Sequence, residues 1–140
     1  MNETLLSVRG LQVEFHTDEG VVHAVNDLSF DVVRGEVFAI VGESGSGKSV
    51  ACMSMLGLIP NAKVVGGEAW WKETDLLKMR PEQMRRIRGG EIAMIFQDPL
   101  TALNPVHRIG RQIGEMVRIH RGASRREARD RAIELLDLVG

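Results

Sequence analysis

Apolar and polar residues alternate along two segments near the start of the chain, residues 5–15 and residues 21–33. Such alternation places the apolar side chains on one face of a β-strand. The residues between the two segments, 17–20, read Thr-Asp-Glu-Gly and are typical of a turn. The pattern therefore predicts an antiparallel hairpin, which a second turn at residues 34–36 connects to the rest of the chain.

A continuous apolar run, residues 37–41, follows the second turn. Its length and composition predict a short strand that is buried in a parallel sheet. A glycine-rich octet at residues 42–49 comes next, and residues 50–56 then predict a helix that ends before Gly57 and Pro60. The predicted order in this region is therefore strand, glycine-rich loop, helix.

Further short strands and helices are predicted in the later part of the chain. Residues 68–72 and 91–96 predict strands, and Pro81 begins a helix that ends at Gly89. Asn104-Pro105 then breaks the chain again.

Two helices close the sequence, at residues 108–120 and 124–139. Ser124 is a good N-cap for the second of them, and Glu127 stands at the capping-box position. The apolar residues of this helix predict one buried face, made of Ala128, Ala132, Leu135, Leu136 and Val139.

The octet at residues 42–49 reads Gly-Glu-Ser-Gly-Ser-Gly-Lys-Ser and fits the pattern G-x-x-x-x-G-K-[ST]. A loop of this kind directs its backbone N–H groups at a chain of phosphates. Lys48 would reach the terminal phosphates, and the hydroxyl of Ser49 would bind Mg²⁺. The N-terminus of the following helix adds partial positive charge to the same place. The octet therefore predicts a binding site for a nucleoside triphosphate.

Composition narrows the class of protein only slightly. The chain has 140 residues, of which 44% are hydrophobic and 26% charged, as is ordinary for one soluble domain. No stretch approaches the ~20 apolar residues that a membrane span needs. Cys52 is the single cysteine, which excludes an internal disulfide and favours a reducing compartment.

Charge is unevenly spread, although the net charge is only −1. Residues 1–70 hold 4 basic and 9 acidic residues, whereas residues 71–140 hold 14 basic and 10 acidic ones. The basic half could face nucleic acid, anionic lipid or a partner with acidic loops, or it could be a solvated helix face. Nucleic acid is disfavoured because no aromatic side chains are interleaved with the arginines.

Four segments, in this order, resemble the ATP-binding-cassette (ABC) family, and specifically the ATPase subunit of bacterial dipeptide and oligopeptide importers. Residues 11–30 resemble the family's N-terminal sheet, and residues 41–49 its phosphate loop. Residues 95–105 resemble the glutamine loop, and residues 109–115 the start of the helical subdomain. Two features are typical of the peptide importers in this family. They are the residues Glu-Ser-Gly-Ser at positions 43–46 of the octet and the continuation of the glutamine loop through Leu-Asn-Pro at residues 103–105.

The resemblance implies an α/β fold, a P-loop NTPase (ABC ATPase) core. Residues 1–35 would form an antiparallel β subdomain and residues 36–60 the strand, phosphate loop and helix. Residues 61–97 would form a β/α segment that ends in the glutamine loop, and residues 98–140 the start of a helical subdomain.

The resemblance also implies roles for individual residues. ATP would be bound through its β- and γ-phosphates by the phosphate loop, which consists of Gly42, Glu43, Ser44, Gly45, Ser46, Gly47, Lys48 and Ser49. Ser49 and Gln97 would contact Mg²⁺, and Gln97 would also sense the γ-phosphate, which makes Lys48 and Gln97 the candidate catalytic residues. An aromatic residue that precedes the phosphate loop stacks on adenine in this family. Phe15 is the best candidate, and a core phenylalanine is the alternative.

The implied partners are a second cassette subunit, identical or different, and membrane-embedded permease subunits that contact residues 98–110. The transported peptide would be bound by other subunits, and nickel or another small solute remains an alternative cargo. The implied location is the cytoplasmic face of the bacterial inner membrane, as a peripheral protein that binds no nucleic acid.

Several catalytic elements of the family have no counterpart among these residues. Cassette ATPases use an apolar strand that ends in Asp-Glu, an LSGGQ-type segment and a later histidine. No LSGGQ-like string occurs here, and the apolar residues 92–96 end in Gln97-Asp98. We therefore expect the sequence to be the N-terminal portion of a cassette domain, either a truncated gene product or part of a longer protein.

Two other classes of function fit the octet alone. A P-loop kinase would need an acceptor site with a lid, and a GTPase would need an Asn-Lys-x-Asp string, which is absent. A non-catalytic nucleotide-binding fragment or regulator would act only by pairing with other subunits.

The missing carboxylate generates the first prediction. Phosphoryl transfer needs an acidic residue that supports Mg²⁺ and a group that positions water. The 140-residue polypeptide should therefore bind nucleotide weakly and release no phosphate from Mg·ATP above the background of its Lys48→Ala variant. Steady, Lys48-dependent phosphate release by a pure preparation of the correct mass would contradict this expectation.

Overall fold

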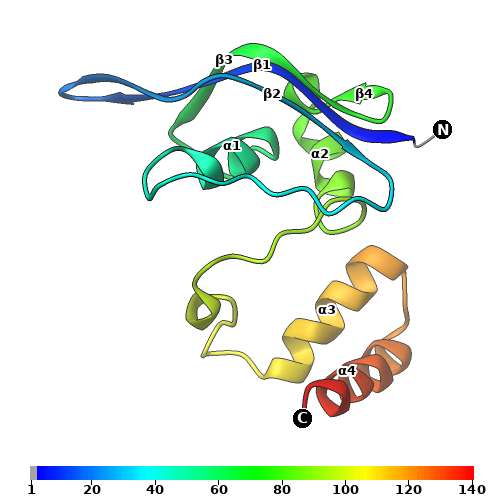
Figure 1. Cartoon of the computed structure of the whole chain (residues 1–140). Helices are drawn as coiled ribbons and strands as arrows, with labels where there is room; N and C mark the ends of the chain where they lie inside the picture. Colours follow the sequence, from blue (N-terminus) through cyan, green and yellow to red (C-terminus); the bar gives the residue numbers. More distant parts are fainter. Residues whose placement is uncertain (1–2) are drawn as a thin grey trace. The chain divides into compact units, whose positions relative to one another are not determined.

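The computed structural model describes residues 3–140, apart from the side chain of Leu100. They form two compact units, one up to Arg85 and the other Arg86–Gly140. The first unit contains an antiparallel sheet of four strands in the order β2-β1-β3-β4 (Figure 1). The strands are β1 (Thr4–Thr17), β2 (Gly20–Val33), β3 (Ala62–Trp71) and β4 (Thr74–Asp75).

The predicted hairpin is confirmed as β1 and β2. Their pairing runs from Thr4 opposite Val33 to Thr17 opposite Gly20, so that the turn contains only two residues, Asp18 and Glu19. β3 pairs with the other edge of β1 and is longer than the strand predicted at residues 68–72. β1 is therefore a central strand of the sheet, whereas β2 is at its edge.

The helices of the chain lie close to their predicted positions. They are α1 (Lys48–Met55), α2 (Pro81–Ile87), α3 (Ile109–Arg121) and α4 (Arg125–Val139), with 3₁₀ turns at Leu76–Lys78 and Pro99–Thr101. α1 packs against β1, β2 and β3, and α3 packs against α4 in the second unit.

The core of the first unit lies where α1 meets the sheet. Val8, Leu11 and Val13 of β1 are fully buried. Ala51 and Met55 of α1 are also buried, and their spacing of four residues places them on one side of the helix. The apolar face of β1 and the apolar side of α1 therefore form one hydrophobic core, as the alternation and the helical period of the sequence predict.

The capping box of α4 is confirmed. The hydroxyl of Ser124 accepts a hydrogen bond from the N–H of Glu127 at 3.3 Å, and the carboxylate of Glu127 accepts one from the N–H of Ser124 at 2.8 Å. Hydrogen bonding by the side chain and then the backbone of Ser124 holds the pKa of the Glu127 carboxyl below its usual value. The predicted apolar face is only partly buried, because Ala128 and Ala132 are covered whereas Leu136 and Val139 are exposed.

The predicted buried strand at residues 37–41 and the predicted strand at residues 91–96 are wrong. Residues 37–41 belong to no strand or sheet among residues 3–140, and Val37 and Val41 are 98% and 88% exposed. Residues 91–96 contribute only an isolated bridge between Arg88 and Ile92, and Ile95 is fully exposed. A parallel strand is buried only where strands lie on both sides and helices cover both faces. Within residues 3–140, neither segment has strands on both sides or helices over both faces.

The core generates a prediction for stability. Leu11→Ala removes a fully buried side chain from β1 and should lower the free energy of unfolding by roughly 2–5 kcal/mol. Val21→Ala is the control at an exposed position of the same hairpin and should change it by less than about 0.5 kcal/mol. Urea denaturation followed by circular dichroism measures both, and equal effects would contradict the assigned core.

Candidate functional site

The glycine-rich octet forms the phosphate loop (residues 42–49), which joins the irregular residues 37–41 to α1. α1 begins at Lys48 with Gly47 as its N-cap. The first helical hydrogen bond runs from the N–H of Ala51 to the carbonyl of Gly47 at 2.9 Å. The N–H groups of Lys48, Ser49 and Val50 precede this bond, so they have no partner in the preceding turn of helix and are available to an anion.

Gly47 fixes the loop against the edge strand of the sheet. Its backbone has φ +91°, and a Cβ atom there would lie 2.3 Å from the carbonyl oxygen of Ala24 in β2. The pairing of β1 with β2 is irregular at this point, because Val13 faces Val25 whereas Glu14 faces His23. Ala24 is therefore the extra residue of a β-bulge, and bulges redirect the local backbone. Only glycine satisfies both the positive φ and the close approach.

Lys48 closes the loop on itself. Its ammonium donates hydrogen bonds to the carbonyls of Gly42 and Glu43, both at 2.7 Å, and to the hydroxyl of Ser46 at 3.2 Å. The side chain thus spans the concave side of the octet and keeps its positive charge there. A charged group held in this way is positioned to attract a polyanion into the loop.

A pocket of about 300 Å³ opens beside the loop. Residues 45–50 form one wall, and Phe15 with Val22 contributes the apolar part. Phe15 is half-buried and lies opposite Val22 across the β1–β2 hairpin. A second pocket of about 420 Å³ on the loop shares Ser46, Gly47 and Lys48 and extends toward Ile40 and Val41. The structure therefore brings Phe15 and the phosphate loop together in one pocket.

The amino-acid sequence of most of the chain matches a known family. Residues 25–140 match the family model described as ABC transporter. The chain belongs to the ABC transporter family. Because this family is one of P-loop ATPases, the match excludes the two alternatives of a P-loop kinase and a GTPase.

Curated relatives of this ABC family member share about half of its residues. The probable peptide ABC transporter ATP-binding protein y4tR of Sinorhizobium fredii is 51% identical over 98% of this chain and 42% of the relative. The dipeptide transport ATP-binding protein DppD of Bacillus subtilis is 49% identical over 99% of this chain and 42% of the relative. The chain thus spans about two fifths of the length of these relatives.

Solved structures show the same fold. A dimeric structure of MJ0796, a bacterial ABC transporter cassette, has a TM-score of 0.79 at 25% identity and covers 94% of this chain and 56% of its own. A second structure of MJ0796, in a post-hydrolysis state bound to ADP and Pi, has a TM-score of 0.76 at 23% identity. The predicted ABC ATPase fold is thereby confirmed.

The other predicted site residue, Gln97, lies in the second unit. It is exposed and stands between the Ile92 bridge and the 3₁₀ turn at Pro99–Thr101. The contact of Gln97 with the γ-phosphate and Mg²⁺ stays a prediction. No cluster of three metal-ligating side chains occurs within residues 3–140.

His23 is a pocket residue that the sequence did not reveal. It lines both pockets beside the loop, and its imidazole Nδ1 lies 3.0 Å from the carboxylate of Glu14. The four histidines are scattered along the sequence without metal-ligand spacing, so the sequence predicts no site role for His23. Its place follows only from the register of the hairpin, which pairs it with Glu14.

Cys52 of α1 lines neither of the two pockets beside the phosphate loop. Its side chain is half-buried, and burial raises the pKa of the thiol above its usual value. A thiol that stays protonated is a poor nucleophile, so Cys52 acts as a small apolar residue in the helix.

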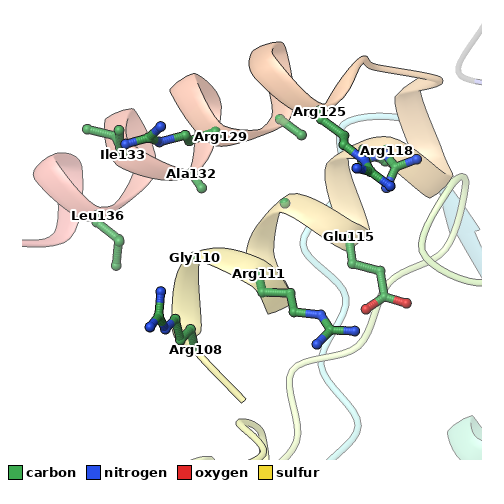
Figure 2. A pocket seen from close by; sticks show the side chains of 12 residues that line it. Arg108, Gly110, Arg111, Glu115, Arg118, Arg125, Arg129, Ala132, Ile133 and Leu136 are labelled. Carbon is green, nitrogen blue, oxygen red and sulfur yellow. The ribbon is translucent and has the colours of Figure 1, made fainter.

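The second unit has a groove of its own, about 830 Å³ in volume, between α3 and α4 (Figure 2). Gly114, Ala128 and Ala132 are its buried residues. Five arginines surround it with a single acidic side chain, that of Glu115; they are Arg108, Arg111, Arg118, Arg125 and Arg129. Within the described residues none of these arginines makes an ion pair or a side-chain hydrogen bond. The excess of basic residues is therefore partly gathered on one concave surface.

None of the helices among the described residues is long and apolar enough to cross a membrane.

Gly47 generates the prediction for this site. In Gly47→Ala the new methyl group would meet the carbonyl of Ala24, and the loop would have to leave β2. We expect the affinity for Mg·ATP to fall at least tenfold in isothermal titration calorimetry. Gly35→Ala is the matched control, because Gly35 also has a positive φ, +78°, but has no atom within 4 Å of the added Cβ. Equal losses in the two variants would show that the contact with Ala24 has no role in shaping the loop.

Proposed function

We propose that the chain is the nucleotide-binding part of an ATP-binding subunit that couples ATP binding and hydrolysis to the import of dipeptides or oligopeptides. The observation that carries the proposal is the phosphate loop, whose free N–H groups and Lys48 stand in one pocket with Phe15. The names of the relatives, which are peptide and dipeptide transport proteins, support the choice of cargo. An ABC ATPase for nickel or another small solute is the alternative, because the fold does not determine the substrate.

In the proposed site the N–H groups at the start of α1 bind the phosphates of ATP. Lys48 would exchange its bonds to Gly42 and Glu43 for the β- and γ-phosphates, and the base would stack on Phe15. Lys48 would stabilise the negative charge that develops on the γ-phosphate, and Gln97 would contact it from the second unit.

Ser49 is the residue that would hold Mg²⁺. It lies in the first turn of α1, lines the Phe15 pocket and makes no side-chain hydrogen bond within residues 3–140. A hydroxyl oxygen is a suitable ligand for Mg²⁺, which prefers oxygen and retains several waters. The bound ion would neutralise charge on the β- and γ-phosphates.

The proposed partners are a second cassette subunit and membrane-embedded permease subunits. A dimeric MJ0796 cassette supports the first, and transport in the relatives' names supports the second. Residues 98–110 would contact the permease, and the adjacent α3–α4 groove offers arginines to acidic loops. The proposed location is the cytoplasmic face of the bacterial inner membrane.

Calorimetry with two ligands tests the site. Lys48→Ala should weaken both Mg·ATP and Mg·tripolyphosphate at least tenfold, because both ligands present phosphates to the loop. Phe15→Ala should weaken Mg·ATP roughly 5- to 140-fold, as expected for loss of about 1–3 kcal/mol of base stacking, and leave tripolyphosphate unchanged.

Phe96→Ala serves as the control for the aromatic substitution, because Phe96 lies in the second unit and is 52% exposed. It should change neither affinity. Binding of Mg·ATP that is indifferent to Lys48→Ala would overturn the proposed function. Equal losses of both ligands in Phe15→Ala would make Phe15 a core residue.

A further inference from the structure

One side chain of α3, Gln112, is bonded to the backbone of the loop that precedes the helix. Its Oε1 accepts a hydrogen bond from the N–H of Asn104 at 2.8 Å. Its Nε2 donates to the carbonyl of Asn104 at 2.9 Å and to the carbonyl of His107 at 2.8 Å. The amide therefore uses its acceptor and its donors on two residues that lie eight and five positions earlier in the chain.

The loop that Gln112 holds is already closed by its own bonds. The side chain of Asn104 accepts a hydrogen bond from the N–H of Val106 at 2.9 Å. The N–H of His107 donates to the carbonyl of Asn104 at 3.2 Å. Pro105 stands between them and has its φ fixed by the ring. Residues 104–107 are thus a tight turn, and Gln112 connects this turn to α3.

Only glutamine fits this set of bonds. The amide has one oxygen that accepts and one NH₂ group that donates twice. A glutamate at position 112 would keep the acceptor for Asn104 and place negative charge against two carbonyl oxygens. An alanine would lose all the bonds.

The loop presents apolar side chains to solvent. Val106, between the two residues that Gln112 contacts, is 82% exposed, and Leu103 and Ile109 on either side are each 46% exposed. Exposed apolar groups on a mobile loop would lose conformational freedom on binding, whereas groups on a fixed loop lose less. The bonds of Gln112 therefore prepare these side chains for contact with an apolar partner surface.

We infer that Gln112 is a positioning residue that fixes residues 104–107 to α3 and thereby presents Leu103, Val106 and Ile109 as one rigid contact surface. The inference rests on the proposed function, in which residues 98–110 contact the permease. The surface and α3 then move as one body, so that a displacement of either is passed directly to the other.

Amide relaxation and hydrogen exchange by NMR on the whole 140-residue chain test the inference without any nucleotide. In the wild type, the order parameters of residues 104–107 should equal those of α3, about 0.85, and Gln112→Ala should lower them below about 0.6. Exchange of the Asn104 amide should accelerate at least tenfold. Arg111→Ala, on the same helix and without a side-chain bond in the described residues, should change neither quantity.

The variant Gln112→Glu separates the effect of the individual hydrogen bonds of Gln112 from a general effect on the stability of α3. It also provides the test if Gln112→Ala unwinds α3. The Asn104 amide should stay protected in this variant, because the carboxylate still accepts its hydrogen bond. The Val106 and His107 amides should become mobile, because the donors to the carbonyls are lost. Unchanged order in both variants, or equal loss along all of α3 in Gln112→Glu, would overturn the inference.

Binding of Mg·ATP separates this inference from the proposed function. Gln112→Ala should leave the affinity unchanged, because Gln112 lies in the unit that lacks the phosphate loop. If the wild-type chain bound no Mg·ATP, the proposed function would be contradicted, whereas the NMR result for residues 104–107 would still support the role of Gln112. A tenfold loss of affinity in Gln112→Ala would instead contradict the local role assigned to Gln112.

Discussion

The contact between Gly47 and the carbonyl of Ala24 is the constraint on which the site depends. It brings the start of α1 to the edge of the sheet at a position where no side chain fits. The bulge at Ala24 supplies the redirected carbonyl, and the positive φ of Gly47 supplies the turn into the helix. The sheet, the phosphate loop and the helix N-terminus are thereby fixed in one arrangement, and Phe15 reaches the same pocket because its strand pairs with the bulged strand.

Electrostatics gives this arrangement its preference for anions. The first turn of α1 contributes N–H groups and partial positive charge, and Lys48 adds a full charge. The ammonium of Lys48 donates hydrogen bonds to carbonyls of its own loop. A polyphosphate must therefore replace these bonds with stronger, charge-assisted ones.

Local features of the fold were predictable, whereas those set by distant residues were not. The hairpin, α1 and the capping box of Ser124 and Glu127 follow from alternation, helical period and short-range bonding. The exposure of Val37 and Val41 could not be foreseen, because burial of an apolar run depends on strands elsewhere in the sequence. In the site, the octet predicted the loop, but the bulge that seats Gly47 has no sequence signature. The bonds of Gln112 and the gathering of arginines between α3 and α4 likewise appear only once the chain is folded.

The most direct test of the account is an NMR titration that follows the backbone amides of the phosphate loop. The account predicts that Mg·ATP and Mg·tripolyphosphate both shift the amide resonances of Gly47, Lys48 and Ser49, and that adenosine leaves them in place. Binding of Mg·ATP that shifts resonances elsewhere while these amides remain unmoved would contradict the claim that the loop receives the phosphates.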